Sequence, residues 1–248
     1  MIRREVAHDR AWVLVLFLVA LVMGPGAMLV SPAGAGTPPG EDLEAAARLT
    51  AQGQAAVERE AYAEAEPRLR EALARVERAL GPDDVRLIGP LADLADLYFG
   101  ERRYAEAAPL YQRWIAIAGP AAAPDDPALV VPVSALAQLY REQGQLRAAA
   151  AYYGRLVAIF TRLMGPEDIH VAFGLVNLAD VYAADGRDPE AEPLYRRAIA
   201  IVEQLAPESP AVAALLEDYA GLLARMDRAA EAEVVRARAK AIYDKSSA

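Results

Sequence analysis

DLADLY at residues 93–98 returns as ALAQLY at 135–140 and again as NLADVY at 177–182. The intervals from residue 93 to 135 and from 135 to 177 are both 42 residues. A fixed period of this size indicates an array of stacked units, because a single unit cannot bury its apolar face alone. Such an array presents a long surface of equivalent positions, so the sequence favours binding other molecules over transforming them.

Each unit is predicted to contain two helices, because apolar residues recur at helical spacing on both sides of a short polar turn. The turns between units recur as GPDD, PDDP, GPED and PESP, beginning at residues 81, 124, 165 and 207. In these turns glycine or proline ends one helix and an acidic residue caps the next. The sequence therefore predicts five helix pairs, at about 41–82, 83–124, 125–166, 167–207 and 208–248.

Two kinds of residue recur at positions where helices must pack closely. Alanine holds one position of the second helices, at Ala65, Ala107, Ala149, Ala191 and Ala232. Tyrosine forms two columns, one of Tyr98, Tyr140 and Tyr182 and the other of Tyr111, Tyr153 and Tyr195. We interpret the tyrosines as large core residues that pack against the small alanines inside the array, rather than as a platform for stacking bases or sugars.

The unit at 167–207 carries a set of residues that resembles a known repeat. The set is Leu178, Ala179, Tyr182, Gly186, Ala191, Tyr195, Ala198 and Pro207. It resembles the tetratricopeptide repeat, and the 42-residue period and the phrase EAEPLYRRA at 190–198 are closer to the longer repeats of kinesin light chains, which many bacterial proteins also carry. The resemblance covers about 41–243. It implies an all-α, right-handed superhelical solenoid of about five helix-turn-helix repeats, with degenerate units at both ends.

The N-terminal segment has the features of an export signal. Arg3, Arg4 and Arg10 precede an uncharged apolar run at 11–23, and small residues including Ala33 and Ala35 follow. This order predicts a secretory signal peptide at 1–35 and a flexible leader at 36–40. The alternative is an uncleaved membrane anchor at 11–30. Both alternatives place the body outside the cytoplasm, and we expect a periplasmic location in a bacterial cell.

Composition excludes several functions. The 248-residue chain has a formal net charge of −9 and no basic stripe, so we expect no nucleic-acid partner. There is no cysteine, which excludes disulfides, thiolate chemistry and thiolate metal ligands. Apolar residues make up 55% of the chain, enough to bury a continuous core.

The chain contains little material for catalysis. After residue 36 the only histidine is His170, at a helix start, and the only serines are Ser134, Ser209, Ser246 and Ser247. No nucleophile and base stand out, and no metal-ligand spacing or phosphate-binding loop is present. We predict no catalytic, metal or cofactor-binding residues. A hydrolase that uses scattered carboxylates is the remote alternative.

The resemblance places a ligand groove on the concave face lined by the first helices. Its implied positions in this chain are Asp93, Asp96, Phe99, Ser134, Gln138, Arg141, Asn177, Asp180 and Asp218. Asn177 matches the asparagine that bonds a ligand backbone in peptide-binding members, whereas the cation pairs of carboxylate-clamp members are not reproduced. Four aspartates on one face favour a partner with basic character. The alternative is that they are ordinary solvated residues.

We therefore interpret the chain as a non-catalytic scaffold that binds a protein or peptide segment in this groove. The alternative is a structural spacer or self-associating component of an envelope assembly that uses an end unit. The last helix carries the residues that distinguish a cap from a docking surface. These are Val234, Val235, Arg236, Arg238, Lys240, Ala241 and Ile242.

Overall fold

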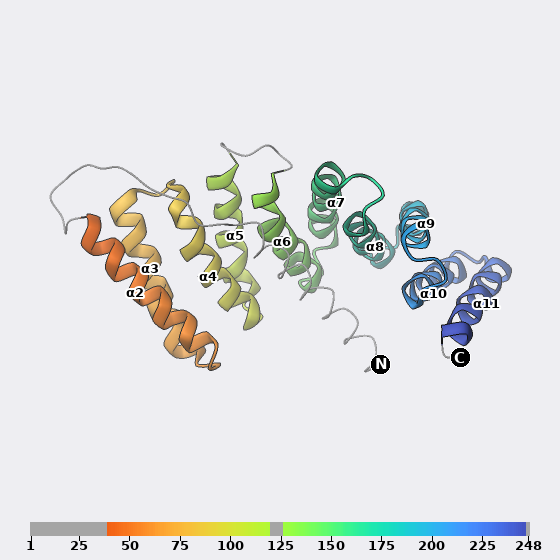
Figure 1. Cartoon of the computed structure of the whole chain (residues 1–248), viewed down its shortest axis with the longest axis horizontal. Helices are drawn as coiled ribbons and strands as arrows, with labels where there is room; N and C mark the ends of the chain where they lie inside the picture. Colours follow the sequence, from red (N-terminus) through yellow and green to blue (C-terminus); the bar gives the residue numbers. More distant parts are fainter. Residues whose placement is uncertain (1–38, 120–125, 247–248) are drawn as a thin grey trace. The chain divides into compact units, whose positions relative to one another are not determined.

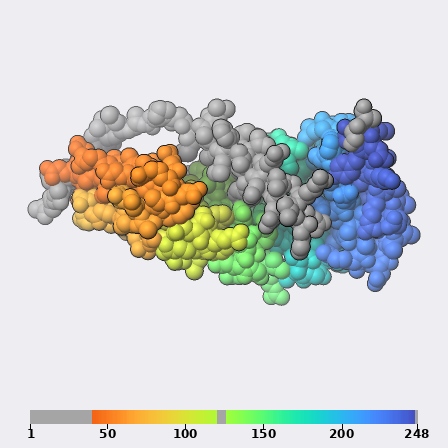
Figure 2. Space-filling view, turned by 90° about the horizontal axis from the view of Figure 1, so that it is seen from below, coloured from red at the N-terminus to blue at the C-terminus, as the bar shows by residue number. Residues whose placement is uncertain are grey.

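A computed structural model describes residues 39–119 and 126–246; the predicted signal peptide or anchor lies outside these residues. The described part contains ten α-helices, two short 3₁₀ helices and no strand. The helices are α2 (Pro39–Val57), α3 (Tyr62–Leu80), η1 (Val85–Leu87), α4 (Ile88–Gly100), α5 (Tyr104–Ala118), η2 (Pro127–Leu129), α6 (Val130–Glu142), α7 (Leu146–Met164), α8 (Ile169–Ala184), α9 (Asp188–Leu205), α10 (Pro210–Arg225) and α11 (Ala229–Ser246). They follow one another in chain order (Figure 1), and the space-filling view shows the same succession (Figure 2). The predicted all-α repeat solenoid is confirmed.

The five pairs are α2–α3, α4–α5, α6–α7, α8–α9 and α10–α11. Each pair is joined by a tight turn with one residue in the left-handed region. These turn residues are Glu60, Arg102, Gly144, Gly186 and Asp227, with φ between 59° and 75°. The next amide bonds back to the end of the first helix; for example, the Arg103 N–H donates to the Tyr98 carbonyl at 2.8 Å. This closure belongs to the Schellman type and fixes the angle at which the second helix leaves.

Polar side chains cap the helices that begin each unit after the first. Asp84 and Asp126 accept hydrogen bonds from the backbone N–H two residues later, at 2.9 and 2.8 Å, and so begin η1 and η2. Asp168 caps α8 in the same way at 2.8 Å. In the last unit Ser209, rather than the acidic Glu208, caps α10 at 3.4 Å. Acidic capping is confirmed at three of these turns, while the residue that caps the last one is a serine.

The alanine column is fully buried in the array. All five alanines have 0% exposed surface. Ala191 lies in a cluster with Ala179, Tyr195 and Leu222, which come from α8, α9 and α10. A small residue here therefore allows one helix to approach both its hairpin partner and the next unit, as predicted from the sequence.

The two tyrosine columns differ. Tyr111, Tyr153 and Tyr195 on the second helices are at most 4% exposed, which confirms their interpretation as core. On the first helices only Tyr98 is as deeply buried. Tyr140 and Tyr182 are half-buried and use their ring faces instead: Tyr140 stacks on Tyr152 with centroids 5.5 Å apart, and the Arg187 guanidinium lies 4.2 Å from the centre of the Tyr182 ring.

Ion pairs between one second helix and the turn that precedes the next second helix reinforce the two ends of the array. Arg103 contacts Glu66 at 2.7 Å, and Arg228 contacts Glu192 at the same distance. In each pair the arginine lowers the pKa of the glutamate. In the intervening units the glutamate position is held by Ala108 and Ala150, so this pair cannot form there. The middle junctions therefore depend more on apolar packing.

The last helix carries charge where inner units are apolar. Arg236 and Lys240 of α11 are exposed and occupy the positions of Tyr195 and Ile199 in α9, which are buried. Arg236 also contacts Glu233 at 2.5 Å. A charged outer side is expected of a terminal unit that keeps a solenoid soluble. Within residues 39–119 and 126–246, no helix combines the length and apolarity required to cross a membrane.

Candidate partner-binding face

The first helices α2, α4, α6, α8 and α10 together form a surface that we call the first-helix face. Hydrogen bonds join neighbouring helices of this face directly. Gln54 Nε2 of α2 donates to Asp93 Oδ1 of α4 at 2.9 Å, and an Arg141 guanidinium nitrogen of α6 donates to Asn177 Oδ1 of α8 at 3.4 Å. Three of the predicted groove residues, Asp93, Arg141 and Asn177, therefore lie in polar contacts that cross from one unit to the next.

Two predicted aspartates also hold hairpins together. Asp96 accepts a hydrogen bond from the Tyr111 hydroxyl, and Asp180 accepts one from the Tyr195 hydroxyl. Each bond joins the first helix of a unit to its second helix. Burial first and the aspartate charge second raise the pKa of both tyrosines, so the hydroxyls remain protonated donors at neutral pH. A carboxylate can accept several hydrogen bonds, so an aspartate that binds a tyrosine hydroxyl can also bind a ligand.

Asp93 is half-buried, whereas Asp96 is exposed. Partial desolvation by the surrounding protein raises the pKa of both carboxyls, opposed by the Gln54 bond at Asp93 and by the Tyr111 bond at Asp96, where the Asp93 charge adds to the rise. Because Asp96 is exposed, water screens this effect there. A cation that binds beside these carboxylates would favour their charged form and so offset the cost of their partial desolvation.

The other predicted residues differ in accessibility. Asp218 is exposed, Gln138 is half-exposed, and Phe99 is half-buried against the Tyr104 ring at 5.6 Å. The prediction that Ser134 projects into the groove is wrong, because Ser134 is only 3% exposed. It lies on α6, where residues 132–137 are all buried. A helix in the middle of the array packs on its hairpin partner and on both neighbouring units, so little of its surface stays open.

Sequence reasoning missed Phe173 and Gln54. Phe173 is 47% exposed, which is unusual for a phenylalanine, and its carbonyl accepts a hydrogen bond from Asn177 Nδ2 at 2.8 Å. The four-residue spacing from Phe173 to Asn177 on one helix was the available signal, since it places both on the same side. Gln54 belongs to the degenerate first unit, where no repeat pattern drew attention to it.

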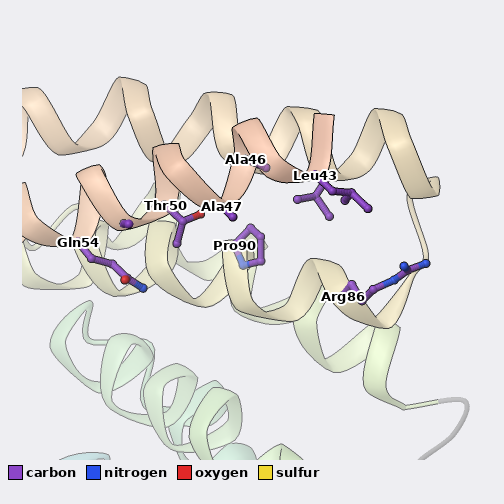
Figure 3. A pocket seen from close by; sticks show the side chains of 9 residues that line it. Leu43, Ala46, Ala47, Thr50, Gln54, Arg86 and Pro90 are labelled. Carbon is purple, nitrogen blue, oxygen red and sulfur yellow. The ribbon is translucent and has the colours of Figure 1, made fainter. Parts of the chain in front are cut away.

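A pocket of about 350 Å³ opens at the start of this face, between α2 and α4. Figure 3 shows Leu43, Ala46, Ala47 and Thr50 on one wall and Pro90 opposite, with Gln54 and Arg86 at the two ends. The α2 side chains here are small, so α2 leaves space that larger residues would fill. The pocket is apolar in its middle and polar at its ends, and Arg86 is already bound to Asp84 at 2.9 Å.

The described residues offer little for metal or acid–base chemistry. No group of three or more His, Asp or Glu side chains within 39–119 and 126–246 is arranged to hold a metal. His170 Nδ1 lies 2.7 Å from Asp168 Oδ1, the same carboxylate that caps α8. This contact adds to the cap at the start of α8 and does not involve a nucleophile.

The sequence profile of the tetratricopeptide repeat matches residues 43–119, 129–204 and 170–245. The chain therefore belongs to the tetratricopeptide repeat family, whose members generally serve as protein-interaction scaffolds. No curated protein matches the chain in sequence.

Solved structures share its fold. BtubC (BKLC) from P. vanneervenii is 23% identical with a TM-score of 0.65, over 84% of this chain and 89% of that one. The kinesin-light-chain TPR-like repeats of Podosopora anserina are 23% identical with a TM-score of 0.66, over 85% and 99%. MamA from Desulfovibrio magneticus RS-1 is 15% identical with a TM-score of 0.58, over 83% and 98%. At these identities the likeness concerns the fold alone.

Proposed function

We propose that this chain is a non-catalytic scaffold whose first-helix face holds a segment of a protein partner. The observation that carries the proposal is Phe173, which is 47% exposed and lies about one helical turn before Asn177. Asn177 donates to the Phe173 carbonyl and accepts from Arg141 of the preceding unit. An aromatic anchor surrounded by polar groups is the usual composition of a binding hot spot, because the ring supplies apolar contact area and the polar groups fix orientation.

The charges of the face support a partner with basic segments. Asp93, Asp96, Asp180 and Asp218 all lie on first helices. Attraction to these carboxylates would raise the association rate and would weaken with added salt. We further propose that the chain is exported through its N-terminal segment and meets this partner in the periplasm, either released or anchored by residues 11–30.

Photo-cross-linking tests which surface binds. We would place p-benzoylphenylalanine at Phe173, where it conserves the aromatic ring, in the full-length chain expressed in its own cells. The matched control carries the same group at Val234, which is 71% exposed on α11 and lies off the first-helix face. We expect an ultraviolet-dependent adduct with a second protein at position 173 and none at 234.

A second pair of variants tests whether the adduct depends on the proposed binding residues or on a protein that is nearby by chance. Asp93→Ala combined with Asn177→Ala should abolish the adduct at position 173, whereas Arg147→Ala combined with Gln204→Ala, both exposed on second helices, should leave it intact. Asp96 and Asp180 are kept, because their removal would break hairpin bonds. An adduct only at position 234 would transfer the function to the outer or terminal surface.

A further inference from the structure

Three units carry a tyrosine at this position of the second helix, and in one of them the hydrogen bond from tyrosine to aspartate is missing. In the second and fourth units it joins residues fifteen apart, as Tyr111–Asp96 and Tyr195–Asp180. In the third unit the residue fifteen before Tyr153 is Gln138. Tyr153 is 1% exposed, and its hydroxyl has no hydrogen-bond partner among the described residues. Burial raises the pKa of the Tyr153 hydroxyl to about 12; the Arg141 charge opposes this rise and the Asp180 charge adds to it.

Glutamine in place of aspartate at this position changes which hydrogen-bonding groups the face presents. The Tyr153 hydroxyl has no hydrogen-bond partner among the described residues, so the Gln138 amide does not accept from it. Unlike a carboxylate, this amide carries an NH₂ group that can donate to a ligand. An aspartate at the same place carries only acceptor oxygens when ionised. The third unit therefore offers donors where the second and fourth units offer acceptors.

Arg141 strengthens the donor character of the third unit. It lies three residues after Gln138 on α6, and its side chain is 22% exposed. Its contacts are long, 3.4 Å to Asn177 Oδ1 and 3.7 Å to a Glu142 carboxylate oxygen, although a guanidinium carries five N–H groups. Along the face, carboxylates in the second unit are followed by a cation in the third and by carboxylates again in the fourth and fifth.

We propose that the first-helix face binds an extended protein segment that carries a cationic, an anionic and a cationic side chain, spaced about three residues apart. The inference rests on the proposed scaffold function and specifies its partner. Long polar side chains bridge successive first helices, as in the Gln54–Asp93 and Arg141–Asn177 bonds, so we take equivalent positions of adjacent units to lie roughly 10 Å apart. An extended chain advances about 3.3 Å per residue, so one unit corresponds to about three residues. The order reads the same in both directions, so either chain direction satisfies it.

Three synthetic peptide pools test the proposal, each with uncharged residues at the spacer positions x. The matching pool is Lys-x-x-Glu-x-x-Lys, the all-basic pool is Lys-x-x-Lys-x-x-Lys, and the reversed pool is Glu-x-x-Lys-x-x-Glu. Binding to the full-length chain in mild detergent is measured by fluorescence anisotropy. We expect the matching pool to bind about tenfold more tightly than the all-basic pool, through one charge-assisted contact, and the reversed pool to bind most weakly.

Variants separate the possible outcomes. Arg141→Glu should reverse the preference in favour of the all-basic pool, while Arg147→Glu, the same charge change at an exposed position of α7, should not. Gln138→Asp should also shift preference toward the all-basic pool, and it should raise the melting temperature by giving Tyr153 its acceptor. Equal binding of the matching and all-basic pools that Arg141→Glu leaves unchanged overturns the proposed order of charges but not the scaffold. If no pool binds, binding at this face is itself refuted.

Discussion

The packing of α8 against α7 gives the sharpest test of the array, through Gly174. A Cβ added at Gly174 would lie 2.8 Å from Val157 Cγ2, closer than Cβ atoms normally approach another heavy atom. Val157 does not turn away cheaply, because valine in a helix holds one rotamer in about nine cases of ten. Gly174 therefore allows the third and fourth units to approach closely.

The matched control is Gly221, an exposed helical glycine on α10 with no atom within 4 Å of its added Cβ. Replacing a glycine inside a helix by alanine stabilises by about 1 kcal/mol through backbone entropy alone. We expect that gain for Gly221→Ala. At Gly174 the same gain is opposed by an overpacking cost of about 1–3 kcal/mol. The free energy of unfolding of Gly174→Ala should thus be about 1–3 kcal/mol lower than that of Gly221→Ala. Relative to the parent protein, Gly174→Ala should range from unchanged stability to a loss of about 2 kcal/mol.

The assay is urea denaturation of the full-length chain and both variants, followed by circular dichroism. Because repeat arrays can unfold in parts, hydrogen exchange in α7 and α8 should accompany it. Faster exchange confined to this junction in Gly174→Ala would locate the strain. If Gly174→Ala stabilises the protein as much as Gly221→Ala, the close contact between α7 and α8 is wrong.

Three further predictions concern stability. Ala191→Leu should cost about 1–3 kcal/mol by overpacking a fully buried site, whereas Ala200→Leu, exposed on the same helix, should not; an unchanged melting temperature for the first would contradict the alanine column. Arg102→Gly should stabilise by about 1 kcal/mol, because Arg102 holds φ at 59° where glycine is unstrained, and a lower denaturation midpoint would argue against this turn geometry. Arg103 lowers the pKa of Glu66 below its ordinary 4.5, so this pair stabilises the fold above about pH 4.5, and the contribution is lost as the pH falls through the folded pKa. Glu66→Gln should therefore destabilise at neutral pH and make little difference in strong acid, as thermal melts across a pH series would reveal.

Much of the fold was predictable because it follows from local chemistry repeated along the chain. The alanine column and the tyrosines of the second helices were identified as core, and all are buried. The acidic caps were also predicted, because an aspartate before a helix acts on the backbone two residues away. The serine cap of the last unit was missed there, since the altered spacing of that unit hid which residue precedes the helix.

The candidate site was predictable only in part. The sequence placed Asp93, Arg141 and Asn177 on first helices, and the structure brings each into contact with a neighbouring unit. The prediction that Ser134 projects into the groove failed because the exposure of a side chain depends on how many neighbours its helix has, and no local sequence pattern records that number. Phe173 was overlooked for the converse reason: a phenylalanine in a repeat is expected in the core, and only the packing leaves it open.

The amino-acid pattern alone defines an array of helical hairpins with alanine and tyrosine interiors, because periodicity, caps and turns act over a few residues and repeat. What each repeated position does depends on how the helices pack. Asp96 and Asp180 occupy the place of Gln138, yet the two aspartates bind tyrosines and the glutamine leaves Tyr153 unpaired. Such differences arise between residues fifteen or more positions apart, where the fold sets the distances.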